Sequence, residues 1–452
     1  MKPNAVQIQL PDSVRQLMNR LNGASCAAYA VGGALRDALL GLEPSDWDVA
    51  TSASPDQVKA LFPDVKITET GIRHGTLTLM LADRSVEVTT FRAESGYSDR
   101  RRPDRVTFLQ DPAADLARRD FTVNAMACGA DGQFLDPFGG RADLEHRILR
   151  CVGDPEERFR EDPLRILRLL RFASKLGFSI EQQTEQAASA SRDLLKTVSA
   201  ERIASELTGI LCGGSAGAVL ASDGEILLPV LPEIGPMIGC EQNNPYHDKT
   251  VWMHTLAVVD AIPRERILRL TAFFHDMGKP ARKTTDENGV DHFRGHPQKS
   301  AEMAEEILRR LAFDRDTIGR VIHLVSRHDL RCDGSERACG RLLYKIGPEY
   351  FDAWMALRRA DTMGQSPRFR ADSLALLDRT EQTCRRLIEE KRCFSLSDLA
   401  LNGADLKAIG IPEGPGMGAL LEQLTEEAAE GLCPNEKEAL LARAGAIRTP
   451  EA

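Results

Sequence analysis

The chain has 452 residues, a length that suits about three domains with several buried cores. A net charge of −9, with 42% hydrophobic and 28% charged residues, excludes wholesale disorder, a collagen-like fibre and a coiled coil. Because the net charge is negative, any phosphate-binding surface must be a local patch of positive charge.

Neither hydropathy nor cysteine spacing indicates a secreted or membrane protein. No stretch approaches 18 uncharged apolar residues, and the first residues lead into no apolar signal-peptide core. The ten cysteines, from Cys26 to Cys433, form no C-x-x-C pair and are expected to be small buried hydrophobes. We therefore expect a cytoplasmic protein without a membrane partner.

The predicted elements change in kind along the chain. Up to about residue 150, short β-type runs such as 76–81 and 86–91 alternate with helical stretches at 11–21 and 55–62. After residue 158 the patterns are amphipathic and helical, at residues 163–176, 200–211, 267–276, 299–311, 316–326 and 371–390. The sequence thus predicts an α+β protein with an α/β head and an all-α remainder. With breaks rich in glycine or proline at 212–217, 232–245 and 410–418, the predicted domains are 1–150, 151–240, 241–370 and 371–452.

The head contains residues suited to phosphate and metal binding. Gly32-Gly33 follows an apolar segment and opens a helical pattern, so its backbone can approach a phosphate, although such a turn is most often only a turn. Strand alternation puts Asp46 and Asp48 on one face, where paired carboxylates suit Mg²⁺; the alternative is a solvated acidic turn. Glu87 lies in a second strand and is either a third acid of a two-metal clamp or an edge residue facing water.

Arginines follow these acids. Arg118-Arg119 and Asn124 could bind a triphosphate or ribose, although an arginine pair is usually a solvated face. A second basic group recurs every third residue, at Arg165, Arg168 and Arg171.

Asp162 and Arg165 form a candidate pair for reading a base. Asp162 precedes Pro163, which is typical of a helix N-cap. The pair would also accept from the exocyclic amine and donate to the ring nitrogen of cytosine or adenine, while rejecting guanine and uracil.

These motifs together resemble the head of class II tRNA nucleotidyltransferases, the CCA-adding enzymes and bacterial poly(A) polymerases. The matching segments are 32–36, 46–48, 87–91, 118–125, 136–140 and 161–165. The resemblance implies a nucleotidyltransferase head in which the two aspartates bind Mg²⁺, the glycine turn holds the triphosphate, and the Asp/Arg pair is a protein template for CTP or ATP. The implied roles fall to Asp46 and Asp48 in catalysis and to Gly33, Arg36, Arg119, Asp162, Arg165, Arg168 and Arg171 in nucleotide binding. Glu87, from its place in the second strand, is the third candidate catalytic acid. Residues 94–105 resemble the flexible loop of this family, which favours addition of the terminal A.

Histidines cluster in the middle of the chain, where seven of the nine lie within residues 247–328. A His…His-Asp…Asp order resembles the HD phosphohydrolase superfamily, and its residues are His254, His275, Asp276 and Asp361. His296 and His328 are spare ligands that could support a second metal. Such a domain implies either metal-dependent phosphohydrolase activity or a tRNA-binding body.

The final helical stretch, residues 402–443, resembles the tRNA-binding tail of HD-bearing CCA-adding enzymes. The expected function is template-independent addition or repair of the 3′-terminal CCA of tRNA, with CTP, ATP and Mg²⁺. Three alternatives stay open: a poly(A) polymerase or A-only adding enzyme, an HD phosphohydrolase with an RNA-binding head, and a noncatalytic tRNA-binding protein.

Overall fold

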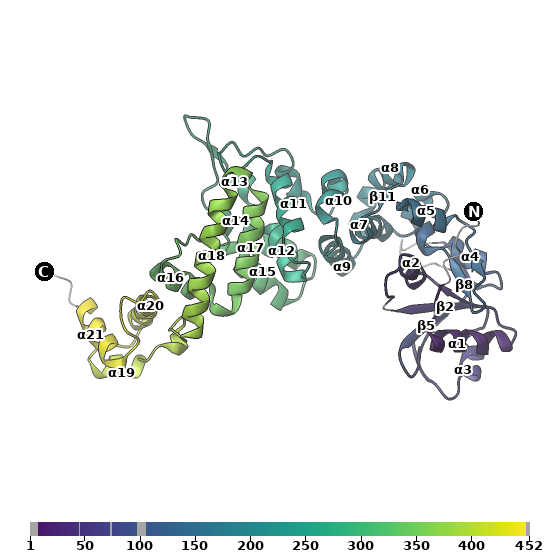
Figure 1. Ribbon diagram of the computed structural model, residues 1–452, viewed down its shortest axis with the longest axis horizontal. Helices are drawn as coiled ribbons and strands as arrows, with labels where there is room; N and C mark the ends of the chain where they lie inside the picture. The colour runs from purple at the N-terminus through teal and green to yellow at the C-terminus, as the bar shows by residue number, and fades with distance from the viewer. Residues whose placement is uncertain (1–7, 45, 73–74, 97–104, 449–452) are drawn as a thin grey trace. The chain divides into compact units, whose positions relative to one another are not determined.

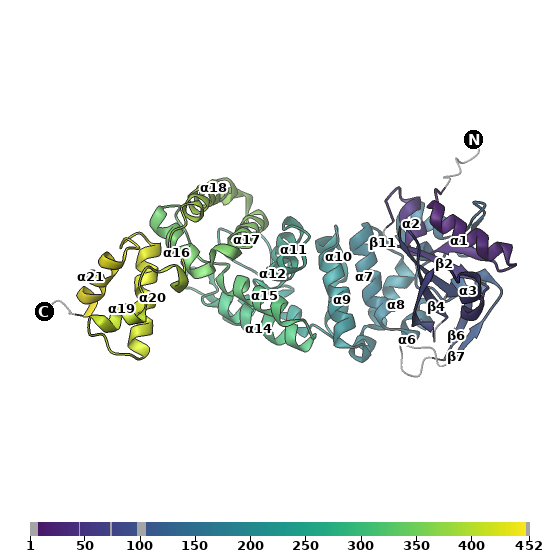
Figure 2. The same ribbon diagram turned by 90° about the horizontal axis from the view of Figure 1, so that it is seen from below.

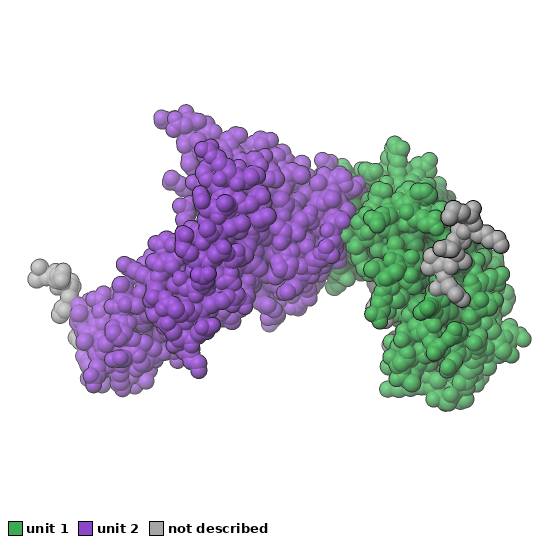
Figure 3. Space-filling view, viewed as in Figure 1, with its two compact units in different colours: residues 1–206 green, residues 207–452 purple. Residues whose placement is uncertain are grey.

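The computed structural model describes residues 8–44, 46–72, 75–96 and 105–448. The chain forms two compact units, residues 1–206 and 207–452 (Figure 3). Of the described helices, none alone is long and apolar enough to cross a membrane, and one bent pair, Ala200–Leu211 with Ala216–Leu227, meets that test in combination. All ten cysteines are free thiols. The expected α+β fold class is confirmed.

A seven-stranded sheet forms the head, with strand order β3-β4-β5-β2-β1-β8-β9 (Figure 1). At its centre β2 pairs antiparallel with β1 and parallel with β5. The strands are β1 Ala28–Val31, β2 Trp47–Thr51, β3 Lys66–Gly71, β4 Thr76–Met80, β5 Ser85–Thr90, β8 Ala127–Gly129 and β9 Phe134–Leu135. A separate hairpin joins β6 Arg92–Ser95 to β7 Arg105–Phe108.

One face of the sheet is buried by α1 (Asp12–Gly23) and α3 (Pro55–Leu61). Trp47 and Val49 of β2 point into this core. Because side chains alternate along a strand, Asp48 between them points to the opposite face. The apolar alternation of β2 therefore fixes the side of the sheet on which the acid lies.

Helices continue the first unit beyond the sheet. α6 ends where Asp162-Pro163 breaks the helix, and α7 begins at Leu164. α7 buries an apolar face and ends at Gly177, whose φ of 66° glycine adopts without steric cost. The helices are α2 Gly33–Leu39, α4 Pro112–Ala117, α5 Gly140–His146, α6 Pro155–Glu161, α7 Leu164–Leu176, α8 Gln182–Ala190 and α9 Ala200–Leu211.

The regular elements of the second unit are helices (Figure 2). The exception is the short hairpin of β12 (Thr284–Thr285) and β13 (Asp291–His292). The predicted helices 299–311 and 371–390 begin a few residues early, in both cases at a first turn that contains proline. The helices are α10 Ala216–Asp223, α11 Val251–Ala261, α12 Arg266–Phe274, α13 Lys279–Arg282, α14 His296–Arg310, α15 Arg315–Arg327, α16 Glu336–Ile346, α17 Phe351–Gly364, α18 Pro367–Glu389, α19 Gly403–Ala408, α20 Pro415–Ala429 and α21 Lys437–Arg448.

Candidate active site and metal centre

A polar cleft of about 490 Å³ in the first unit brings together residues from β2, the glycine turn and α7. Of the residues predicted for the head site, all but Glu87 and Arg118 line it. They are Gly33, Arg36, Asp46, Asp48, Arg119, Asp162, Arg165, Arg168 and Arg171. Part of the predicted flexible loop, residues 97–104, lies outside the described residues.

The glycine turn packs directly against the acids. Gly32 has φ of 78°, which favours glycine. A Cβ added there would lie 3.1 Å from Asp48 Oδ2 and 3.2 Å from Arg119 Nη1. A side chain at Gly32 would therefore crowd both groups, and the bare backbone leaves the cleft open beside them.

Negative charge concentrates around Asp48. It is paired with Glu87 of β5 in the parallel register, so both side chains lie on the same face. Burial raises the pKa of Asp48 to about 6; Arg119 opposes this shift, and Glu87 and Asp46 add to it. A desolvated carboxylate with two acidic neighbours is a hard-oxygen donor set that a divalent cation would stabilise.

The arginines of the cleft are held in place by the head. Arg36 donates to Asp37 Oδ1 at 2.6 and 2.8 Å and to Asn124 Oδ1 at 2.7 Å. Arg119 lies near Asp115 and Asp48, and burial lowers its pKa. Its Nε has no hydrogen-bond acceptor within the described part of the chain. These guanidiniums are partly desolvated cations at the cleft wall, which suits an anionic ligand.

Arg168 fastens α7 to the head through Asp120. Its Nε donates to Asp120 Oδ2 at 2.8 Å and its Nη2 at 2.5 Å. Burial alone would raise the pKa of Asp120, but Arg168 and the hydrogen bond from Asn124 lower it to about 2. Arg168, the second of the three arginines that recur every third residue, is therefore bound to the Asp120 carboxylate of the head.

The predicted base-reading pair lies at the start of α7, and both members already have partners. Asp162 Oδ1 accepts from Leu164 N at 3.1 Å, so it also caps the helix as its position before proline predicts. Its Oδ2 accepts from Arg202 Nη2 at 2.9 Å. Arg165 Nη1 donates to Glu161 Oε2 at 2.8 Å.

Sequence reasoning missed Arg202, which lines this cleft, and the contact of Glu161 with Arg165. Glu161 is the last residue of α6 and Arg165 lies in the first turn of α7, so the two charges meet across the break at Asp162-Pro163. The signal for Arg202 was weaker, because its partner lies 40 residues away in sequence. Only the packing of α9 near α7 brings these two residues together.

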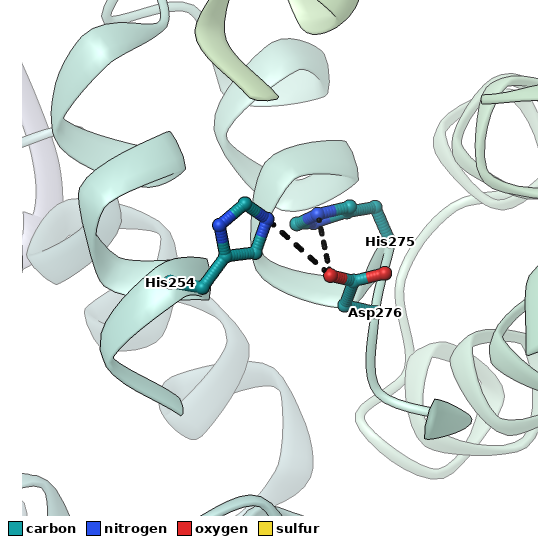
Figure 4. Close-up of side chains that lie close together, drawn as sticks. All are labelled: His254, His275 and Asp276. Carbon is teal, nitrogen blue, oxygen red and sulfur yellow. Dashed lines mark ion pairs between the residues drawn. The ribbon is translucent and has the colours of Figure 1, made fainter. Parts of the chain in front are cut away.

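In the second unit, four predicted metal ligands converge in a buried cluster, which we call the His–Asp cluster: His254, His275, Asp276 and Asp361 (Figure 4 draws the first three). His254 Nε2 lies 3.1 Å from Asp361 Oδ1 and 3.4 Å from Asp276 Oδ2. His275 Nε2 lies 3.2 Å from the same Asp276 oxygen. Three helical segments, α11, the end of α12 and α17, thus bring their ligands to one point.

The other oxygen of Asp276 faces two further imidazoles. His296 Nε2 lies 3.3 Å and His328 Nε2 3.7 Å from Asp276 Oδ1, and the two nitrogens lie 3.1 Å apart. Each Nδ1 contacts a backbone carbonyl, of Phe293 at 2.8 Å and of Val325 at 2.7 Å. Since a carbonyl can only accept, each Nδ1 donates to its carbonyl, and the two Nε2 atoms point toward each other and toward the carboxylate.

The buried nitrogens and carboxylates of this cluster are better placed to bind a cation than to form hydrogen bonds with one another. Both ring nitrogens of His254 and the Nε2 of His275 are buried without a hydrogen-bond partner among the described residues. Burial alone would raise the pKa of Asp276, but His275 and Lys279 hold it well below its ordinary value. The donor set of imidazoles and ionised carboxylates is that of a divalent metal site.

Comparison with known proteins finds matches to three protein families. Residues 28–150 match the family described as the poly A polymerase head domain, 177–237 the probable RNA and SrmB-binding site of polymerase A, and 296–444 the putative tRNA nucleotidyltransferase domain 2. The chain is 34% identical over 433 residues to a CCA-adding enzyme of Lactobacillus johnsonii, covering 94% of each chain. It is 32% identical over 434 residues to that of Levilactobacillus brevis, covering 95% of this chain and 96% of the relative.

Solved structures extend the similarity. The CCA-adding enzyme of Bacillus stearothermophilus in complex with CTP superposes with a TM-score of 0.70 at 27% identity, covering 99% of this chain and 98% of that one. The Thermotoga maritima CCA-adding enzyme complexed with tRNA has the same fold, with a TM-score of 0.61 at 19% identity and 98% coverage of each chain. With cleft, sequence and fold in agreement along nearly its whole length, the chain belongs to the family of CCA-adding enzymes.

Proposed function

We propose that this chain adds or repairs the 3′-terminal CCA of tRNA from CTP and ATP and releases pyrophosphate. The observation that carries the proposal is the single cleft in which Asp46 and Asp48 face the glycine turn and the arginines of α7. A catalytic acid pair, a phosphate-binding turn and a base-reading helix are the three parts that template-independent nucleotide addition requires.

The acids of the cleft would hold Mg²⁺. The raised pKa of Asp48 beside Asp46 and Glu87 supports this, because a bound cation relieves the repulsion between them. When bound, the ion would activate the 3′-hydroxyl of tRNA and align the triphosphate. Gly33, Arg36 and Arg119 would orient the triphosphate beside these acids.

Asp162 and Arg165 would select the base. A carboxylate accepts from the amine of cytosine or adenine, and a guanidinium donates to the adjacent ring nitrogen. Uracil and guanine present a carbonyl oxygen and an N–H at these positions, which would leave desolvated groups unpaired. Arg168 and Arg171 would continue the basic surface along α7.

The decisive assay uses purified protein, tRNA that ends before the CCA, and each labelled nucleoside triphosphate alone and in pairs. Incorporation of two C residues followed by one A supports the proposal. Growth of an A tail would identify a poly(A) polymerase, and a single A added only to tRNA ending in CC would identify an A-only enzyme. No extension with any nucleotide would overturn the assignment.

A second function is favoured by the His–Asp cluster. We propose that residues 241–370 form an HD-type domain in which His254, His275, Asp276 and Asp361 hold a divalent metal, and His296 and His328 with Asp276 a second one. The unpartnered nitrogens of His254 and His275 support the first site, and the convergence of Asp276, His296 and His328 supports the second. Such a site would hydrolyse phosphoesters, since a bound divalent cation lowers the pKa of its water.

This function is tested with p-nitrophenyl phosphate and bis(p-nitrophenyl) phosphate in the presence of Mg²⁺, Mn²⁺, Ni²⁺ or Zn²⁺. Hydrolysis that requires one of these metals supports it. A cluster that binds metal without hydrolysis would be a structural centre. We further propose the division into head 1–150, neck 151–240, HD-type body 241–370 and tRNA-binding tail 371–452.

A further inference from the structure

Two basic side chains contact the two carboxylates of the His–Asp cluster. Lys279 Nζ lies 2.7 Å from Asp276 Oδ2, and Arg358 Nη1 donates to Asp361 Oδ2 at 2.9 Å. In each pair the cation lies three residues from its acid. The exposed side-chain fractions are 7% for Lys279 and 20% for Arg358. Charges that are this well sheltered from water act strongly on one another and on any ion beside them.

Lys279 contacts the oxygen of Asp276 that faces two imidazoles. The Nε2 atoms of His254 and His275 lie 3.4 and 3.2 Å from Oδ2, and Figure 4 shows both rings beside this oxygen. The same ammonium donates to Gln242 Oε1 at 2.8 Å, and this bond holds it in place. Lys279 therefore stands next to the atom that a metal bound by these imidazoles would use.

Arg358 contacts the opposite oxygen of its acid. Asp361 Oδ1 is the oxygen that lies 3.1 Å from His254 Nε2, whereas the guanidinium binds Oδ2. Gln365 Nε2 donates to Oδ1 at 3.3 Å, which leaves that oxygen a second lone pair for a ligand. A hydrogen bond to the oxygen that does not face the imidazole fixes the direction of the carboxylate. Arg358 thus orients Asp361 without standing at its ligating atom.

From this contrast we infer that the two cations set the metal affinity of the His–Asp cluster in opposite directions. Lys279 weakens it through charge repulsion at the ligating oxygen of Asp276, and Arg358 strengthens it by positioning Asp361. The inference rests on the proposed metal centre. Two positive charges on one buried carboxylate oxygen repel each other strongly, whereas hydrogen bonds that orient a ligand typically support metal binding. The cluster would then bind a divalent ion less tightly than its donor set alone implies.

The test is calorimetric titration of Ni²⁺ into the full-length protein, with Mg²⁺ in excess. Imidazole suits Ni²⁺, and the excess Mg²⁺ occupies the carboxylates of the head. Lys279→Gln and Arg358→Gln are a matched pair, because each replaces a cation by the same neutral amide. We expect Lys279→Gln to lower the dissociation constant for Ni²⁺ by at least roughly tenfold. Arg358→Gln should raise it by roughly ten- to a hundredfold.

The signs of the two changes decide the outcome. His254→Ala identifies which binding event belongs to this ligand set, because it removes one of the imidazoles. Tighter binding in both glutamine variants would reflect only the loss of positive charge, and weaker binding in both only the loss of a structural contact. Either result would overturn the inference, as would an unchanged dissociation constant in Lys279→Gln.

Failure of the metal centre itself gives a different result. Absence of Ni²⁺ binding at this ligand set in the wild-type protein would overturn the metal-centre assignment, and the inference with it. Thermal unfolding midpoints show whether each variant is folded. If Lys279→Gln does not fold, Lys279→Met removes the charge with an apolar side chain that fills the same buried space. Wild-type affinity in that variant would refute the repulsion.

Discussion

Asp48 combines a position that suits catalysis with an environment that disfavours its charge. It is half-buried on the sheet face opposite α1 and α3, and two acidic neighbours surround it. A raised pKa means that the folded state is penalised wherever this carboxylate is ionised. The ionised Asp48 carboxylate therefore destabilises the head at the position where a cation would bind.

For activity, Asp46→Ala and Asp48→Ala should each abolish addition of both nucleotides while leaving tRNA binding nearly intact. The acids would hold the ion that aligns the reacting groups, and they hardly touch the body of the RNA. Single-turnover extension and a gel-shift titration with tRNA measure the two effects. Near-normal rates in either variant would refute the assignment.

For stability, Asp48→Asn should raise the free energy of unfolding at pH 7.5, in the absence of divalent metal, by on the order of 2–3 kcal/mol. The folded pKa of about 6 exceeds the unfolded value of 3.8, so the penalty is absent below about pH 4 and is complete above pH 6. Urea denaturation at pH 4.0 and 7.5 measures the difference. An equal effect of the substitution at both pH values would show that charge burial is not its cause.

At the scale of elements, α7 is the part of the chain on which most contacts of the cleft depend. Its apolar face is buried, and its charged face meets the head through Arg168 and α9 through Arg171. Because these contacts come from two sides, the reading face has little freedom to shift.

Asp120 anchors that helix, and its contribution should depend on pH. Its folded pKa of about 2 lies below the unfolded value of 3.8, so the carboxylate stabilises the fold above about pH 4 and this contribution is lost as pH falls through 2. Asp120→Asn should cost about 2–3 kcal/mol of unfolding free energy between pH 5 and 8. Its difference from wild type should shrink in urea denaturations performed below pH 4. A difference that stays constant down to pH 2.5 would contradict the ion-pair explanation.

At the start of α7, Asp162→Ala and Arg165→Ala should each narrow the preference for CTP and ATP over UTP and GTP by roughly ten- to a hundredfold. Incorporation of each nucleotide onto tRNA ending at the discriminator base and at CC gives the ratios. Asp162→Asn is the control, since it keeps an oxygen that can accept from Leu164 N and so retains the cap. Slower addition with unchanged ratios in both alanine variants would leave Asp162 as a helix cap only.

At the scale of the whole molecule, the two sets of chemical groups belong to different compact units, residues 1–206 and 207–452. Each unit has its own buried cores. The two proposed activities are therefore expected to be independent of each other.

His275→Ala combined with Asp276→Ala should abolish metal-dependent phosphohydrolase activity and spare nucleotide addition. The reciprocal variant Asp46→Ala should do the opposite. Both assays are run on each variant after its thermal unfolding midpoint shows that it is folded. Loss of CCA addition in the His–Asp variant, to the extent seen with Asp46→Ala and with tRNA binding intact, would refute two independent sites.

Local sequence patterns determine several features of this fold. The period of two in β2 places Asp48 opposite the core, the Asp162-Pro163 step ends α6 before α7, and apolar periodicity predicts α7 and α9. Such features depend on neighbours a few residues apart, which the sequence displays directly.

Tertiary structure alone decided the contacts between distant residues. Asp162 meets Arg202, Arg168 meets Asp120, and His328 joins His296 at Asp276 across separations that no local periodicity encodes. The sequence does not distinguish a charged residue on a helix surface that faces water from one that faces an opposite charge. Only packing brings the counter-charge near and removes the water, and that desolvation is what fixes the arginines of α7 in place.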